Sequence, residues 1–166
     1  MALPLLTSLE LVYIAMGADS DHELISYIVD AFPRLKHLEI HRYRGNWYGL
    51  SRYKPMARIL SRAQSLRTVR LNLDFRNDPR PYCVDGRLRD RWLQKLREKI
   101  GPEIVRIMQT CASLEHVAIL YHGSPSSVWV EFHPSRARCV EPRFVMSYSD
   151  PYVDSEMLPP RRNLAF

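Results

Sequence analysis

The sequence lacks the features of disulfide-stapled, zinc-binding or membrane-spanning proteins. Its 166 residues include only three cysteines, Cys83, Cys111 and Cys139, with no C-x-x-C pair, so neither a disulfide framework nor a zinc ribbon is indicated. No apolar run reaches the roughly 20 residues that cross a bilayer. Residues 3–16 also lack the basic start and small-residue exit of a signal peptide. We therefore expect a protein of the cytoplasm or nucleus, with reduced thiols and no membrane contact.

Motifs of common catalytic chemistries are missing too. The sequence holds no glycine-rich phosphate loop, no H-E-x-x-H and no G-x-S-x-G. His37, Glu39 and His116 could share a face, but they match a metal or acid–base set only loosely. We expect no enzyme activity, no catalytic residues, no cofactor and no metal site.

The composition is that of an ordinary folded domain. Hydrophobic residues make up 46% and charged residues 25% of the chain, which argues against disorder and gives enough apolar surface for one core. The formal charge of +6 favours weak attraction to acidic partners, nucleic acid included, but serves solubility equally well. Charge alone decides nothing about function.

A repeat organises the chain. Segments 3–11, 32–40, 63–71 and 111–119 align without gaps as L-x-x-L-x-L, with Val or Ile allowed in the later positions. The spacing is 29 residues from Leu6 to Leu35, 31 from Leu35 to Leu66, and 48 from Leu66 to Leu114. The first two intervals lie near the upper end of leucine-rich repeats. The third leaves room for one additional helix.

Helical patterns fill the intervals between these segments. A capping box, S-D-H-E, begins at Ser20, and Pro33 closes the helix that follows. A second helix begins near Pro55. The third interval shows two apolar stripes, separated at Gly101-Pro102, which predicts two helices with a break between them.

This order predicts an α/β fold: a leucine-rich-repeat-like solenoid with parallel strands on one face and helices on the other. We expect a single domain over residues 1–149, with repeats near 3–31, 32–62, 63–110 and 111–149. Residues 128–132 alternate as a strand and residues 143–148 form a weaker strand, together a short β cap or return hairpin. The proline-containing residues 150–166 are expected to be a loosely ordered tail. The oligomeric state is left open.

Several segments resemble the C-terminal repeat regions of fungal F-box proteins. They are F-P-x-L-x-x-L-x-I at 32–40, S-L-R-T-V-R-L-N-L-D-F at 65–75, C-A-S-L-E-H-V-A-I-L at 111–120 and V-W-V-E-F at 128–132. The likeness covers roughly residues 3–132 and consists of loose repeat motifs. In that family an N-terminal F-box docks on the adaptor of a cullin–RING ubiquitin ligase, and the repeats recruit the substrate. The resemblance therefore implies the recruiting half of such a protein.

The first repeat begins by residue 3, with no F-box and no polar capping element before it. Terminal repeats normally carry a polar outer face, and a bare strand edge invites unwanted pairing. Either the first strand is a frayed edge, or the natural protein carries sequence before Met1. The second reading is our expectation.

Stacked strands would place the residues between the apolar positions in rows, about 4.8 Å apart from strand to strand. The rows are Ser8, His37, Thr68 and His116; Glu10, Glu39, Arg70 and Ala118; Val12, His41, Asn72 and Leu120. Solenoids often bind through such a concave sheet. The candidate contact residues are His37, Glu39, His41, Arg70, Asn72 and His116. The alternative is that these side chains simply alternate outward, with Glu39 and Arg70 as a cross-strand charge pair.

Residues 41–54 interleave cations with aromatic side chains after the second strand. Arg42, Arg44, Trp47 and Tyr48 are its candidate contact residues. Such a mixture suits a protein interface, or nucleic-acid binding through stacking and phosphate neutralisation, or simple packing of a long loop. The leading hypothesis is a protein-binding repeat module that recruits substrate for an SCF-type ubiquitin ligase. The alternative is a nucleic-acid-binding domain that uses this loop.

Overall fold

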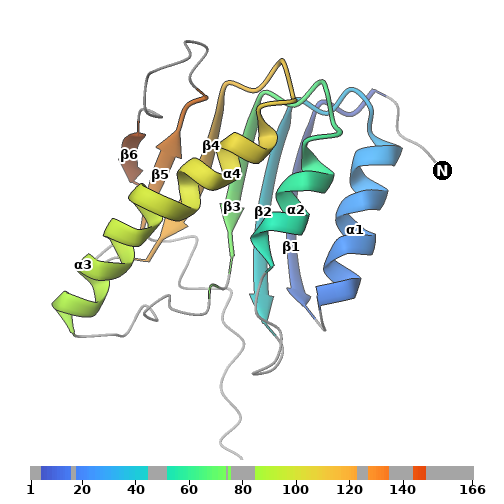
Figure 1. The fold of residues 1–166 in the computed structure, drawn as a ribbon. Helices are drawn as coiled ribbons and strands as arrows, with labels where there is room; N and C mark the ends of the chain where they lie inside the picture. The colour runs from blue at the N-terminus through green and yellow to red at the C-terminus, as the bar shows by residue number, and fades with distance from the viewer. Residues whose placement is uncertain are drawn as a thin grey trace, which may run out of the picture.

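The computed structural model describes residues 5–15, 18–44, 52–73, 75, 85–122, 127–134 and 144–148. They form an α/β fold around one open, mostly parallel sheet whose strands follow the order of the sequence (Figure 1). The strands are β1 (Ser8–Ala15), β2 (His37–Arg44), β3 (Thr68–Asn72), β4 (His116–Tyr121), β5 (Val128–Phe132) and β6 (Phe144–Tyr148). None of the helices described has the length and apolar character needed to cross a bilayer.

The first four strands are parallel neighbours, as the repeat predicts. Leu9 pairs with Leu38, Leu38 with Val69, and Val69 with Val117. The same register extends into the turn before each strand, where one backbone bond recurs at equivalent positions. The amide of Lys36 donates to the carbonyl of Thr7, that of Arg67 to Lys36, and that of Glu115 to Arg67, at 2.7–2.8 Å. The aligned segments are therefore equivalent in space as well as in sequence.

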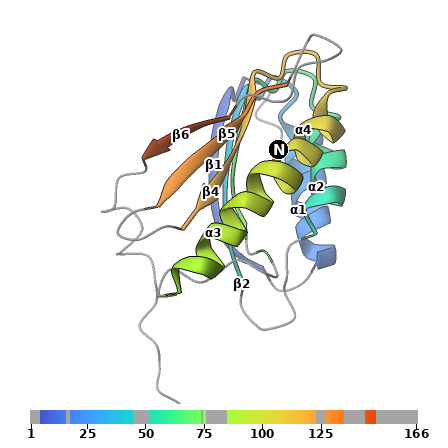
Figure 2. The same ribbon diagram turned by 60° about the vertical axis from the view of Figure 1, so that its left-hand side comes forward.

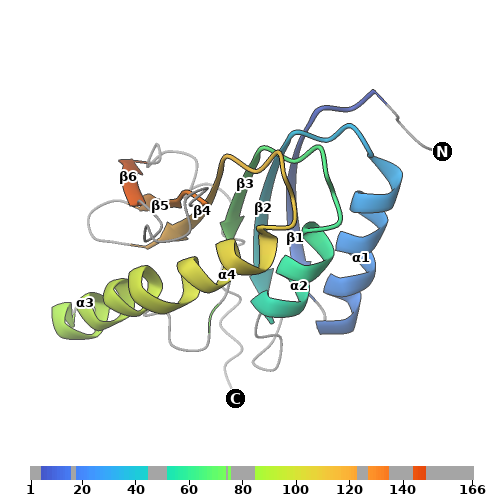
Figure 3. The same ribbon diagram turned by 45° about the horizontal axis from the view of Figure 1, so that its top comes forward.

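The helices lie on one side of this sheet (Figures 2 and 3). They are α1 (Ala18–Ala31), α2 (Tyr53–Leu60), α3 (Gly86–Lys95), the π-helical turn η1 (Leu96–Ile100) and α4 (Gly101–Met108). Each of the strands β1, β2 and β3 is followed by helix before the next strand begins, so helical side chains and alternate strand residues share one interior. We call the helix-covered side of the sheet the helix-side face.

The main core lies between the helices and the helix-side face. The first leucine of the repeat is buried at Leu35, Leu66 and Leu114. The next apolar positions of the repeat, such as Leu38 and Val69, are buried in the same core. The equivalent Leu6 is only partly buried because β1 is the edge strand. Neighbouring repeats thus cover each other's leucines, which one repeat alone could not do.

Two expectations about the helices were wrong in detail. Helix α1 begins at Ala18, so Ser20 lies inside its first turn and does not occupy the N-cap position. The expected break at Gly101-Pro102 is also absent: α3, η1 and α4 run on continuously from residue 86 to residue 108. The amide of Gly101 donates to the carbonyl of Leu96, five residues back. This wider π-type turn leaves room for the ring of Pro102 in the helix.

Gly101 has a packing role. A Cβ at this position would overlap the ring of Phe132 on β5, so only glycine allows the helix to approach the strand this closely.

The end of the described chain agrees with the predicted return hairpin. Strand β5 pairs with β4 in the antiparallel direction, and β6 pairs with β5 in the same way. The last two strands therefore extend the parallel sheet and do not form a separate unit. The expected tail, residues 150–166, lies outside the described residues.

Candidate partner-binding surface

The side of the sheet opposite the helices carries the predicted rows; we call it the polar face. Ser8 pairs with His37, His37 with Thr68, and Thr68 with His116. The second row is likewise in register, as are the first three members of the third. The pairs are Glu10 with Glu39, Glu39 with Arg70, Arg70 with Ala118, Val12 with His41, and His41 with Asn72. The candidate residues on neighbouring strands of the sheet therefore do lie side by side.

Histidine is concentrated on this face. The chain has six histidines, and five belong to the polar face by strand alternation or by their contacts: His37, His41, His116, His122 and His133. Their imidazoles add donors, acceptors and metal-binding nitrogens to the surface.

Exposure changes across the polar face from β1 to β5. At the β1 edge the Glu10 side chain is 63% exposed and Ile14 is 58% exposed. Toward the middle, Asn72 is only 3% exposed, and on β5 Trp129 is 5% exposed. The part of the face that a partner can reach therefore lies over β1, β2 and the Arg70 side chain on β3.

Trp129 lies in the buried part of the face and was not among the candidate residues predicted from the sequence. It lies opposite Leu120 on β4 and shares a small cluster with Leu120 and Ala118. The guanidinium carbon of Arg70 lies 5.5 Å from its ring centroid, and the His41 ring meets it edge-on at 6.1 Å. The alternation of V-W-V-E-F carried the signal, since it places Trp129 and Glu131 on one face.

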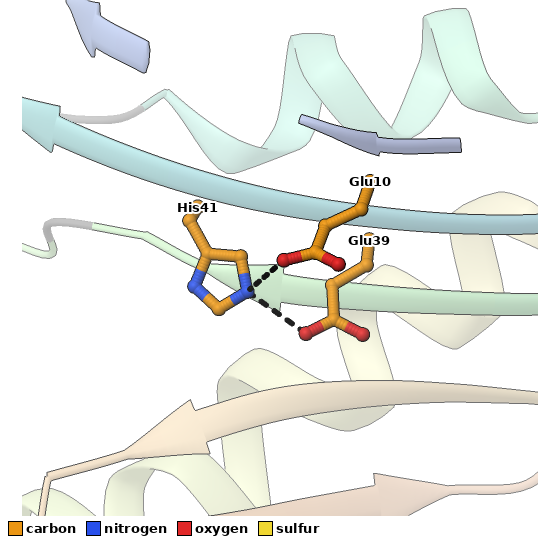
Figure 4. A group of neighbouring side chains, drawn as sticks. All are labelled: Glu10, Glu39 and His41. Carbon is orange, nitrogen blue, oxygen red and sulfur yellow. Dashed lines mark hydrogen bonds and ion pairs between the residues drawn. The ribbon is translucent and has the colours of Figure 1, made fainter. Parts of the chain in front are cut away.

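Glu10, Glu39 and His41 converge on one point at the accessible side of the face (Figure 4). The Nε2 atom of His41 lies 2.8 Å from a carboxylate oxygen of Glu39 and 4.0 Å from one of Glu10. All three ligand atoms lie within 4.8 Å of one another. The hydrogen bond with His41 lowers the pKa of Glu39, and the charge of Arg70, 3.5 Å away, acts in the same direction. Glu39 is therefore a carboxylate at neutral pH.

The other ring nitrogen of His41 leads into a chain of polar contacts. Its Nδ1 lies 3.4 Å from the amide nitrogen of Asn72, whose carbonyl oxygen lies 3.1 Å from Nε2 of His122. Nδ1 of His122 in turn lies 3.2 Å from the hydroxyl of Ser127. Asn72, predicted as a contact residue, instead connects two histidines below the surface.

The first row has its own pair of histidines. Rings of His116 and His133 lie 5.4 Å apart, centroid to centroid. Burial lowers the pKa of His116. Arg70 and His133 also lower this pKa, whereas the carboxylates of Glu131 and Glu115 raise it. His116 is therefore neutral at physiological pH. His37, the exposed member of the row, shares a 2.8 Å hydrogen bond with the hydroxyl of Thr68.

No family model, curated protein or solved structure matched the chain in the three comparisons made. The resemblance to fungal F-box repeat regions stays a prediction from the sequence motifs.

Among the contact residues predicted in the segment 41–54, Arg42 does not join the rows of the polar face. The Arg42 side chain is 1% exposed, lies on the helix side of β2, and donates from Nε to Asp21 of α1 at 2.8 Å. The hydroxyl of Tyr13 donates to the other oxygen of Asp21 at 3.1 Å. Arg42 therefore belongs to the interior and cannot contact a partner. The Arg44 side chain, Trp47 and Tyr48 lie outside what the structure describes.

Proposed function

We propose that this chain is a protein-binding repeat module, a solenoid of the leucine-rich-repeat kind that takes its partner on the polar face. The register of the four parallel strands supports the repeat, because residues at equivalent positions pair from strand to strand. The recurring backbone bond before each strand supports it as well.

One observation carries the proposal: among the described residues, helices cover the helix-side face only, while the polar face offers mixed chemistry over β1 to β3. Its accessible side chains combine carboxylate, cation and apolar surface, as protein interfaces do. They are Glu10, Val12, Ile14, His37, Glu39 and Arg70.

The resemblance to fungal F-box proteins suggests what the module would serve. In that family the repeats recruit the substrate to an SCF-type ubiquitin ligase. By this analogy, the partner is a protein presented for ubiquitination, and the polar face selects it. Enzyme activity is not part of the proposal.

The alternative of nucleic-acid binding has less support. It was built on residues 41–54, of which Arg42 is buried and 45–51 lie outside the described part of the chain. A binding curve that falls steeply with salt would revive it, because phosphate contacts release counterions.

The test is capture of partner proteins from cells by the wild-type chain and by two charge-reversed variants. Arg70→Glu changes the polar face, where the Arg70 side chain is 43% exposed. Arg58→Glu, on the exposed side of α2, is the matched control on the opposite side of the molecule. We expect Arg70→Glu to lose the proteins that wild type and Arg58→Glu both capture. Equal capture by all three would refute the assignment of the polar face.

A further inference from the structure

We propose that Glu10, Glu39 and His41 form a binding site for a divalent zinc ion on the polar face. The inference rests on the geometry of the three side chains and does not depend on the proposed protein-binding role.

The ligand atoms are already close to the separation that zinc requires. Zinc bonds to imidazole nitrogen and carboxylate oxygen are about 2.0–2.2 Å long, so two ligand atoms of a tetrahedral site lie about 3.4 Å apart. The Nε2 of His41 lies 2.8 Å from Glu39 and 4.0 Å from Glu10, on either side of that value. Only short side-chain shifts separate the present arrangement from a three-ligand site, and the exposed Glu10 is the residue able to make the larger one.

The backbone explains why the two carboxylates stand together. Glu10 and Glu39 are direct partners in the parallel pairing of β1 and β2, and His41 lies two residues along β2 on the same face. Like charges opposite each other on neighbouring strands destabilise a sheet. A cation between them removes that repulsion. The positive charge of Arg70 lies 3.5 Å from the Glu39 oxygen that His41 does not contact.

The surroundings of His41 are those of a fixed ligand. The ring packs edge-on against Trp129, and Asn72, 3% exposed, faces its second nitrogen. Histidines that bind metal usually donate their other N–H to an oxygen, which fixes the ring and its tautomer. When zinc takes Nε2, the proton lies on Nδ1. A turn of the Asn72 amide then lets its oxygen accept from Nδ1 and its nitrogen donate to His122.

The ligand set selects the kind of metal. An imidazole with two carboxylates suits zinc and related transition metals, whereas magnesium and calcium prefer all-oxygen sites. Three protein ligands leave the fourth position of a tetrahedral ion for water or for a group on a bound partner.

The competing explanation is that a proton alone joins His41 to Glu39. Isothermal titration of the purified, tag-free chain with zinc chloride at neutral pH separates the two explanations. We expect one-site binding by the wild type, a loss of affinity of about tenfold or more in Glu10→Gln and in Glu39→Gln, and no comparable binding of magnesium. Thermal unfolding of each variant without metal shows that it is folded.

Controls on the same face distinguish this site from zinc held elsewhere by histidines. His133→Gln and His37→Gln remove imidazoles that lie outside the proposed site, and both should bind zinc as wild type does. Absence of one-site binding in the wild type would overturn the proposal. So would unchanged affinity in Glu10→Gln, or loss of binding in His133→Gln.

Asn72 supplies a second readout. Asn72→Asp presents an oxygen to Nδ1 of His41 in either orientation, and we expect it to keep or raise the zinc affinity. Asn72→Leu offers no acceptor and should lower the affinity about tenfold or more. Equal affinity in the aspartate and leucine variants would remove Asn72 from its proposed positioning role.

Discussion

The two faces of the same sheet have opposite character, although they are built from alternating residues of the same strands. On the helix-side face, Leu38, Val69 and Val117 belong to one buried apolar core with residues of the helices. On the polar face, the residues immediately before them in each chain segment, His37, Thr68 and His116, carry hydrogen-bonding groups. The difference shows that a strand can stabilise the fold with one set of residues and leave the other set available for binding.

The helix-side face is not wholly apolar, and its buried ion pair should produce the largest effect. Asp21→Ala leaves Arg42 buried without its carboxylate, so we expect a loss of about 3–5 kcal/mol in the free energy of unfolding. Urea denaturation measures it. The control is Asp30→Ala, at another position of α1, which breaks an exposed ion pair with Arg62. It should cost below about 1 kcal/mol. Equal costs would mean that the Asp21–Arg42 pair is not buried.

Adjacent positions on β3 test the comparison directly. Leu71 is buried on the helix-side face and Arg70 lies on the polar face. We expect Leu71→Ala to cost about 2–5 kcal/mol, because it leaves a cavity. Arg70→Ala should cost below about 1 kcal/mol, because the Arg70 side chain that contacts Glu39 and Trp129 is itself 43% exposed. Urea unfolding of both variants would contradict the assignment of faces if the arginine change cost more.

The close approach of α4 to β5 at Gly101 allows a third test, with a smaller expected change in the free energy of unfolding. Gly101→Ala places a methyl group against the Phe132 ring and should destabilise the fold by about 1–3 kcal/mol. In a Phe132→Leu background the same change should cost less, because the ring is gone. Additive costs in a double-mutant cycle would contradict the contact.

The smallest effect concerns pH and the polar face. The folded chain holds the pKa of His116 below its ordinary value of 6.5, so the unfolded chain binds a proton first as the pH falls. His116 therefore leaves the free energy of unfolding unchanged above about pH 6.5 and lowers it progressively below that pH. Unfolding of His116→Gln should depend less on pH between 8 and 5 than that of wild type. A steeper pH dependence in His116→Gln than in wild type would contradict this direction of the pKa shift.

The repeat made most of the parallel sheet predictable. Leu35, Leu66 and Leu114 recur because each must fill the same place in the interior, so aligning them fixes both the strands and the rows beside them. The helix from residue 86 to residue 108 was less predictable. Gly101-Pro102 is a local breaking signal, and the π turn and the contact with Phe132 that override it depend on distant residues.

The site was predictable in its rows but not in its centre. His37, Glu39 and Arg70 follow from register alone. Trp129 reaches the face because β5 returns antiparallel beside β4, where it lies opposite Leu120, and that pairing is a long-range contact. Arg42 was misplaced because β2 continues to Arg44, which puts residue 42 on the same side as Leu38 and Ile40.

The register of the second row supports both the binding face and the metal site, and a shift of one residue would turn every side chain to the other face. NMR contacts between backbone protons across the strands measure it directly. The structure predicts contacts that link Glu39 on one side to Glu10 and on the other to Arg70, in the parallel pattern. Contacts that pair Glu39 with the neighbours of those residues, or in the antiparallel pattern, would contradict the account.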